Sequence, residues 1–272
     1  MLARGVEEAS RAQMDPASPF RRIAPFFARA DIAFINLESP FSDRGAIANS
    51  RMIFRADPQA IAGLELAGID VVSTANNHAR DAGKHGLAFT LSLLANHGIA
   101  AVGTAASQEA LREGVVLERN GARFGFLAYT YDQSNGNYPN ADAPVAMLDA
   151  EAMREDVIRL RQRTDVVVVS MHAGVEYAMK PSARQIEFAR AAIDAGATVV
   201  AGHHPHVVQP VERYRAGVIF YSLGNLVFDQ VQRRETQTGL IAEVFFDAGR
   251  LESYRVHEVD IVETVPQFRS GS

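Results

Sequence analysis

Cysteine is absent from this chain of 272 residues. Disulfide bonds and thiolate ligands are therefore excluded, and a metal ion would have to be held by His, Asp, Glu and Asn side chains. The absence does not decide the compartment, because proteins of the cytoplasm and of the cell envelope can both lack cysteine.

A basic tract and a long apolar run are also missing. The net charge is −5 with no Lys/Arg-rich stripe, which argues against a nucleic-acid partner. No apolar run reaches the 18 or so residues that cross a membrane. The chain passes from Met1 straight into charged residues, unlike a secretion signal. We expect a soluble chain without a transmembrane segment, in the cytoplasm rather than exported.

The composition is that of a globular protein, with 47% hydrophobic and 22% charged residues. Short apolar runs alternate with amphipathic, Ala-rich stretches, a pattern typical of repeated βα units. We see no internal repeat and no linker, and expect one domain over residues 1–272. The predicted strands are 31–37, 69–74, 99–103, 165–171, 197–201, 207–214, 217–223, 240–247 and 251–260, and the predicted helices are 58–67, 86–97, 107–112, 149–162 and one that begins at Pro181.

Three further segments carry local signals. Asn120-Gly121, between the apolar runs 114–118 and 123–129, predicts a two-residue hairpin turn. The polar stretch 132–144 predicts an exposed loop long enough to be a lid or a binding segment. The first residues, 1–3, look like the end of a strand, so we expect further residues upstream.

The histidine-rich run Gly202-His203-His204-Pro205-His206 follows a predicted buried strand. Pro205 favours an extended backbone at His204, which would point His204 and His206 to the same side. Two neutral imidazoles aimed at one point suit a transition-metal ion. The alternative is a polar loop that merely contains many histidines.

Other potential ligands share the same position, the C-terminal end of a predicted strand. In open α/β sheets the crevice outside these ends binds ligands. Mixed nitrogen and oxygen ligands without sulfur predict one or two divalent ions, of Mn, Fe or Zn. Such a pair would activate water, with one histidine left to act as general acid or to stabilise developing charge. The predicted ligands are Glu38, Asn77, His172, His204 and His206, and the predicted catalytic residue is His78.

Of four further residues, two have two possible interpretations each, and the other two are expected to support the site. Glu176 either orients an imidazole or is a solvent-exposed carboxylate. His203 is either a third histidine of the site or a turn residue. Asp81 is expected to brace the loop after His78, and Asn225 to bond a ligand histidine. Cations near these segments can attract an anionic substrate, although scattered surface cations are the commoner explanation; they are Arg44, Arg51, Arg55, Lys84 and Lys180.

Five segments together resemble the CapA family of poly-γ-glutamate capsule biosynthesis proteins, which have the calcineurin-like metallophosphoesterase fold. These segments, in the family's order, are Ile35-Asn36-Leu37-Glu38-Ser39-Pro40, Ala75-Asn76-Asn77-His78 with Asp81-Ala82-Gly83, Ser170-Met171-His172-Ala173-Gly174-Val175-Glu176-Tyr177, Gly202-His203-His204-Pro205-His206-Val207 and Tyr221-Ser222-Leu223-Gly224-Asn225. The resemblance implies a four-layer α/β/β/α sandwich. It also implies that the five predicted ligands occupy metal positions and that His78 occupies the catalytic histidine position.

The chain departs from the family pattern at two points. Family members open with a strand that ends in Gly-Asp, just before a stretch resembling residues 1–5, and that Asp would be a metal ligand. Typical phosphoesterases of this fold also have Asp where this chain has Glu38. Ordinary phosphomonoesterase activity therefore does not follow from the resemblance.

The leading functional hypothesis is a metal-dependent, hydrolase-like protein in the synthesis or processing of poly-γ-glutamate. A second is a non-catalytic assembly or export component of capsule synthesis, and a third is a phosphoesterase of small molecules. The expected partners are an anionic polymer or a small-molecule substrate, together with the capsule synthesis machinery that the resemblance implies.

Overall fold

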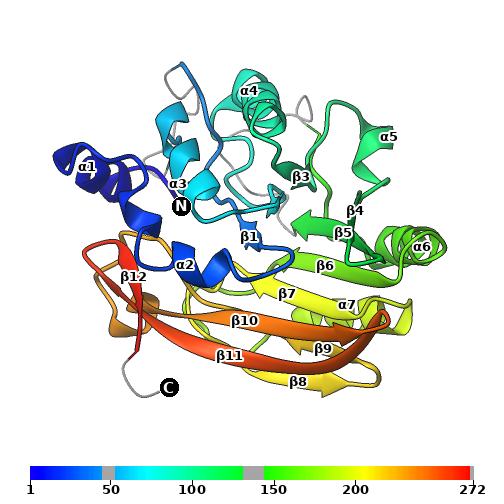
Figure 1. Ribbon diagram of the computed structural model, residues 1–272. Helices are drawn as coiled ribbons and strands as arrows, with labels where there is room; N and C mark the ends of the chain where they lie inside the picture. Colours follow the sequence, from blue (N-terminus) through cyan, green and yellow to red (C-terminus); the bar gives the residue numbers. More distant parts are fainter. Residues whose placement is uncertain (45–52, 131–143, 270–272) are drawn as a thin grey trace.

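The computed structural model describes residues 1–44, 53–130 and 144–269 (Figure 1). Its first part contains a parallel three-stranded sheet in the order β1-β2-β3, with Phe34 of β1 opposite Val71 of β2. The elements of this part are α1 (Gly5–Ala12), η1 (Ser18–Phe20), α2 (Ala24–Phe27), β1 (Phe34–Asn36), η2 (Pro58–Ala60), α3 (Ile61–Leu66), β2 (Val71–Ser73), α4 (Gly83–Asn96), β3 (Ala100–Val102) and α5 (Gln108–Leu111).

A six-stranded sheet follows, in the order β4-β5-β6-β7-β9-β8. The strands β5, β6, β7 and β9 are parallel, and the antiparallel β4 and β8 form the two edges. This part consists of β4 (Val115–Arg119), β5 (Ala122–Thr130), α6 (Ala150–Arg161), β6 (Val166–His172), α7 (Ala183–Asp194), β7 (Val199–His203), β8 (Val211–Tyr214) and β9 (Gly217–Phe220).

Alternating side chains give the central sheet two apolar faces. On β5, Leu127 packs in the cluster that contains α6 and α7, whereas Phe126 packs in the cluster that contains Val71 of β2. Because successive residues of a strand point to opposite faces, one strand contributes to both clusters. On the opposite side of the small sheet, Val72 packs with Leu64 of α3. The layers are therefore helix, sheet, sheet and helix.

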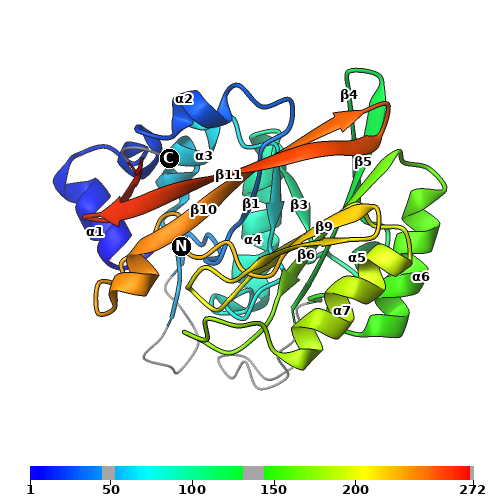
Figure 2. The ribbon, with the colours of Figure 1, turned by 90° about the horizontal axis from the view of Figure 1, so that it is seen from below.

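The chain ends in an antiparallel sheet of β10 (Thr238–Asp247), β11 (Arg250–Val262) and β12 (Val265–Phe268), preceded by η3 (Arg234–Gln237). Figure 2 shows β10 and β11 running across the molecule on the side away from α6 and α7. Phe220 of β9 contacts Tyr254 of β11, with ring centroids 5.7 Å apart. The small parallel sheet and this C-terminal sheet thus face the central sheet from the same side.

The expected four-layer α/β sandwich is confirmed, and so is the hairpin at Asn120-Gly121, where φ is 51° and 78° as a type I′ turn requires. The prediction that residues 1–3 end a strand is wrong, because they form a buried, irregular segment before α1. The predicted loop 132–144 lies outside the described residues, except Pro144. None of the helices in the described ranges has the length and apolar character needed to cross a membrane.

Candidate functional site

Segments far apart in sequence converge at the strand ends. Glu38 lies two residues beyond β1, and Asn77 lies beyond β2, while His172 is the last residue of β6. His172 Nε2 lies 2.8 Å from Asn77 Oδ1 and 3.9 Å from Glu38 Oε1. His206 Nε2 lies 3.7 Å from the same Glu38 oxygen. The ring centroid of His204 lies 5.0 Å from that of His172. The structure therefore brings all five predicted ligands together, from both facing sheets.

Glu38 is an ionised carboxylate in a buried position. Burial raises the pKa of Glu38, but attraction to His206 and His78 outweighs this effect and lowers the pKa. Its Oε2 accepts a hydrogen bond from Asn36 Nδ2 at 3.2 Å. Within the described residues its Oε1 has no hydrogen-bond partner, although two imidazoles lie just beyond hydrogen-bond distance. An oxygen in this state leaves room for a positive ion.

Burial favours the neutral form, which is the form that binds metals, in three imidazoles of the site. Burial lowers the pKa of His172 well below its usual value, and neighbouring histidines lower it further. Burial also lowers the pKa of His204, and that of His203 to about 4. One ionised carboxylate among neutral imidazoles and an amide oxygen is a donor set suited to a divalent cation.

The distances also allow a shared ion, although the ligands are not arranged as a finished metal site. Two ligand atoms that each lie roughly 2.1 Å from an ion are at most about 4.2 Å apart, and the separations around Glu38 are within this limit. His172 Nε2, however, donates to Asn77 Oδ1, and among the described residues no group of three or more His, Asp or Glu side chains forms a metal-holding cluster. The residues fit a cation once this hydrogen bond opens.

His206 is oriented by Asn225. Its Nδ1 donates to Asn225 Oδ1 at 2.9 Å, while Asn225 Nδ2 donates to the carbonyl oxygen of Thr236 at 2.9 Å and to Gln230 Oε1 at 3.3 Å. Both of these neighbouring oxygens are acceptors and can pair only with the amide nitrogen of Asn225. The amide oxygen of Asn225 must therefore face the imidazole. In the neutral imidazole the proton is then on Nδ1, and Nε2 is the nitrogen that faces Glu38. This agrees with the role expected for Asn225, which stays a prediction.

The prediction of an extended backbone from His204 to His206 is wrong. The two residues have φ values of 97° and 59°, so the segment bends after β7 instead of continuing it. A positive φ is costly for a residue with a side chain, so the surrounding structure must hold it in place. The interpretation of His203 as a turn residue is also wrong, because this residue ends β7 and lies 6.4 Å from the ring of Phe34 between the sheets.

His78 is fixed from two sides. Its Nδ1 lies 2.7 Å from Asp81 Oδ2, and the backbone N–H of Phe54 donates to the same oxygen at 2.7 Å. The Phe54 ring stacks on the imidazole with centroids 3.7 Å apart. The sequence predicts that Asp81 stabilises the loop after His78. In the structure Asp81 contacts the imidazole of His78 directly. Phe54 had no sequence signal, because an isolated apolar residue in a loop matches no motif.

Glu176 lies at the rim of the site. Its carboxylate is exposed; burial raises the pKa of Tyr177, and the neighbouring Glu176 carboxylate raises it further. This carboxylate lies near enough to His204 to raise the pKa of this imidazole, against the larger effect of burial. Within the described residues no hydrogen bond joins it to an imidazole, so an orienting role for Glu176 stays a prediction.

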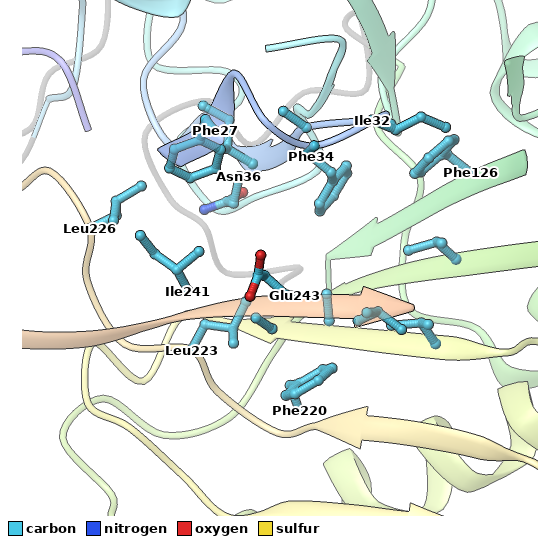
Figure 3. Close-up of a pocket in the computed structure, with 18 of the residues that line it drawn as sticks. Phe27, Ile32, Phe34, Asn36, Phe126, Phe220, Leu223, Leu226, Ile241 and Glu243 are labelled. Carbon is cyan, nitrogen blue, oxygen red and sulfur yellow. The ribbon is translucent and has the colours of Figure 1, made fainter. Parts of the chain in front are cut away.

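A cavity of about 760 Å³ extends from the site between the sheets (Figure 3). Glu38, His203 and His206 line one end of it. The rest combines apolar side chains, among them Phe34 stacked on Phe126, with charged ones that include Glu243. In the described chain β1 pairs only with β2, and β10 pairs with β11 apart from one bridge near Gly224.

Two solved structures of proteins from Thermus thermophilus resemble this fold. A hypothetical protein superposes with a TM-score of 0.59 at 16% identity, over 90% of this chain and 94% of that one. A 5'-nucleotidase precursor superposes with a TM-score of 0.51 at 19% identity, over 76% of this chain and 40% of that one. At these identities the likeness shows the α/β fold of the nucleotidase domains and nothing of activity.

Sequence relatives are closer. The chain is 32% identical to PGA biosynthesis protein CapA of Bacillus subtilis over 270 residues, which are 98% of this chain and 70% of that protein. It is 31% identical to capsule biosynthesis protein CapA of Bacillus anthracis over 239 residues, 85% of this chain and 58% of that protein. The model of the family described as bacterial capsule synthesis protein PGA_cap matches residues 1–230, and the chain therefore belongs to this family.

Proposed function

We propose that this chain is a metal-dependent, hydrolase-like protein that acts in the synthesis or processing of a poly-γ-glutamate capsule polymer. The observation that carries the proposal is Glu38 Oε1, a buried, ionised oxygen faced by the Nε2 atoms of His172 and His206. A divalent cation would compensate this charge and engage the imidazoles. The polymer is proposed from the names of the two Bacillus relatives, which the chain matches over part of their length.

The predicted ligands would hold one or two ions of Mn, Fe or Zn. A divalent cation at this place supplies Lewis acidity for the attacking water and for the leaving oxygen or nitrogen. Asn225 accepts a hydrogen bond from His206 Nδ1, which makes Nε2 of the neutral imidazole the nitrogen available as a ligand. Asp81 holds His78 at Nδ1, which leaves Nε2 to exchange a proton with the leaving group.

Metal binding is tested first, by titrating the protein with Mn²⁺ and Zn²⁺ in a calorimeter and measuring its metal content. We expect Glu38→Ala and His206→Ala to lose binding at least tenfold. His97→Ala is the matched control, because its imidazole pairs with Glu65 at an exposed position. Unchanged binding in Glu38→Ala would refute the assignment of the ligands.

Hydrolysis is tested separately, with poly-γ-glutamate and with phosphomonoesters as substrates. We expect metal-dependent cleavage of the polymer, abolished in His78→Ala. Cleavage of phosphomonoesters alone would identify a phosphoesterase of small molecules. Metal binding without cleavage of either substrate would favour an assembly or export component.

A further inference from the structure

The left-handed backbone at Tyr177 marks a second feature of the site. Its φ of 65° is unusual for an aromatic residue and has to be held by its surroundings. The N–H of Tyr177 donates to the carbonyl oxygen of Pro205 at 2.8 Å, between His204 and His206. Its ring centroid lies 6.4 Å from that of His206. The strained conformation therefore places this ring against the histidine loop.

Hydrogen bonds connect Tyr177 to the partner of His206. Gln230 Nε2 donates to the Tyr177 hydroxyl oxygen at 3.4 Å, and Gln230 Oε1 accepts from Asn225 Nδ2 at 3.3 Å. Gln230 is buried, so these contacts are shielded from water. Tyr177 and His206 thus belong to one network that fixes their relative position.

Arg233 stacks on this ring from the outside. Its guanidinium carbon lies 4.7 Å from the Tyr177 ring centroid, and the residue is exposed. Stacking occupies the face of a guanidinium and leaves the N–H groups at its edge available for a carboxylate. In the part of the chain that the structure describes, no carboxylate forms an ion pair with Arg233. Arg4, which stacks over Phe54 in a similar way, is instead paired with Asp229.

We propose that Arg233, positioned by Tyr177, is a carboxylate-binding subsite at the rim of the histidine cluster, and that it holds an acidic side group of an anionic chain. A cation at this place also has a carboxylate side chain close by in the sequence of the same rim, because Glu176 directly precedes Tyr177 and is exposed. A stacked guanidinium can bind a carboxylate through two parallel hydrogen bonds.

The surface on the same two segments fits an aliphatic chain between carboxylates. Val175 and Met179 flank Tyr177 in sequence, and Val231 precedes Arg233 by two residues; their exposed fractions are 62%, 55% and 65%. Exposed apolar side chains beside a cation suit a ligand in which methylene groups alternate with acidic groups. The inference rests on the proposed function for the reaction at the histidines, but the subsite can be tested by binding alone.

The test measures the dissociation constant of fluorescently labelled poly-γ-glutamate oligomers by anisotropy, with the full chain at fixed salt concentration. We expect Arg233→Ala to weaken binding about tenfold or more, since hydrogen bonds to charged groups are the strong ones. Arg233→Lys should restore only part of the affinity, because lysine keeps the charge without the two parallel bonds. Glu176→Gln should tighten binding, because it removes a negative charge beside the subsite.

Arg234→Ala is the matched control. Arg234 neighbours Arg233 and is also exposed, but its charge acts on Asp260 of β11. We expect its affinity for the polymer to stay within about twofold of the unmodified protein. Equal weakening by both substitutions would reduce the effect to general surface charge and overturn the proposal. Absence of binding by the unmodified chain would overturn it as well.

Inorganic phosphate, added as a competitor, separates the carboxylate from another anion. We expect phosphate at millimolar concentration to displace the polymer no better than acetate does. Displacement by phosphate alone would overturn the assignment to carboxylates. None of these measurements requires turnover. They can therefore refute the subsite even if metal-dependent hydrolysis is found, and they can support it even if no hydrolysis is found.

Discussion

The direction of a single amide group decides how the site can work. Asn225 offers its oxygen to His206 because its nitrogen is already donated to Thr236 and Gln230. Partners of this kind orient an imidazole and choose its protonated nitrogen. Asn225 is therefore expected to control metal affinity although it would not touch the ion.

We predict that Asn225→Ala lowers the affinity for Mn²⁺ or Zn²⁺ about 10- to 100-fold, because His206 can then rotate or take the other tautomer. Calorimetric titration measures the change. Asn225→Asp keeps the acceptor oxygen and should retain more affinity than the alanine variant. Asn96→Ala, at the exposed end of α4, is the control. Equal affinity in all three variants would show that Asn225 does not act on the metal site.

Sequence patterns located the chemistry-bearing residues better than their supports. The motifs at the strand ends identify Glu38, His172 and His206 directly. The structure places the Nε2 atom of each histidine within 4 Å of Glu38 Oε1. Phe54 and Arg233 carry no such signal, because stacking on an imidazole or a phenol depends on how distant segments meet. The bend at His204 was missed since proline was expected to keep the preceding residue extended.

At the scale of elements, strands with strong periodicity or turn chemistry were predictable. The hairpin of β4 and β5 follows from Asn120-Gly121, which accepts positive φ at both positions. Five of the described elements were not predicted, namely α1, η1, α2, η3 and β12. Helix α1 buries only Val6, so it lacks an apolar stripe, and β12 contains Pro266, which disfavours a strand except at an edge.

The close approach of β7 and β9 depends on Gly202. A Cβ atom at this position would lie 2.0 Å from the backbone oxygen of Tyr221. Tyr221 directly follows β9, and its backbone carbonyl cannot move aside as the end of a flexible side chain can. Gly202 therefore sets the distance between β7, which ends at His203, and the chain just beyond β9.

We predict that Gly202→Ala lowers the free energy of unfolding by about 3 kcal/mol or more, because overpacking forces the backbones apart. Gly98→Ala is the control, since its Cβ would meet no atom within 4 Å but its φ is 71°. The control should lose only about 1 kcal/mol, from backbone strain. Urea denaturation compares the two variants. Similar losses would show that the contact with Tyr221 is not tight in solution.

At the scale of the whole molecule, the site joins two sheets that share no strand. Glu38 and Asn77 follow strands of the small parallel sheet, whereas His172 and the His203–His206 segment belong to the six-stranded sheet. Periodicity predicted most of these strands, but not which sheets would face each other. That information came from the family resemblance, because the packing of sheets is decided by contacts between distant segments.

An ion shared by residues of both sheets would also hold the sheets together. Since binding to the folded state alone stabilises it, a cation at 100 times its dissociation constant should add about 2.7 kcal/mol. We predict that Mn²⁺ or Zn²⁺ at that excess raises the Tm by about 5 to 10 °C. Glu38→Ala should abolish the increase and His97→Ala should retain it. An equal increase in both variants would place the stabilising ion elsewhere, and the two sheets would then be joined by packing alone.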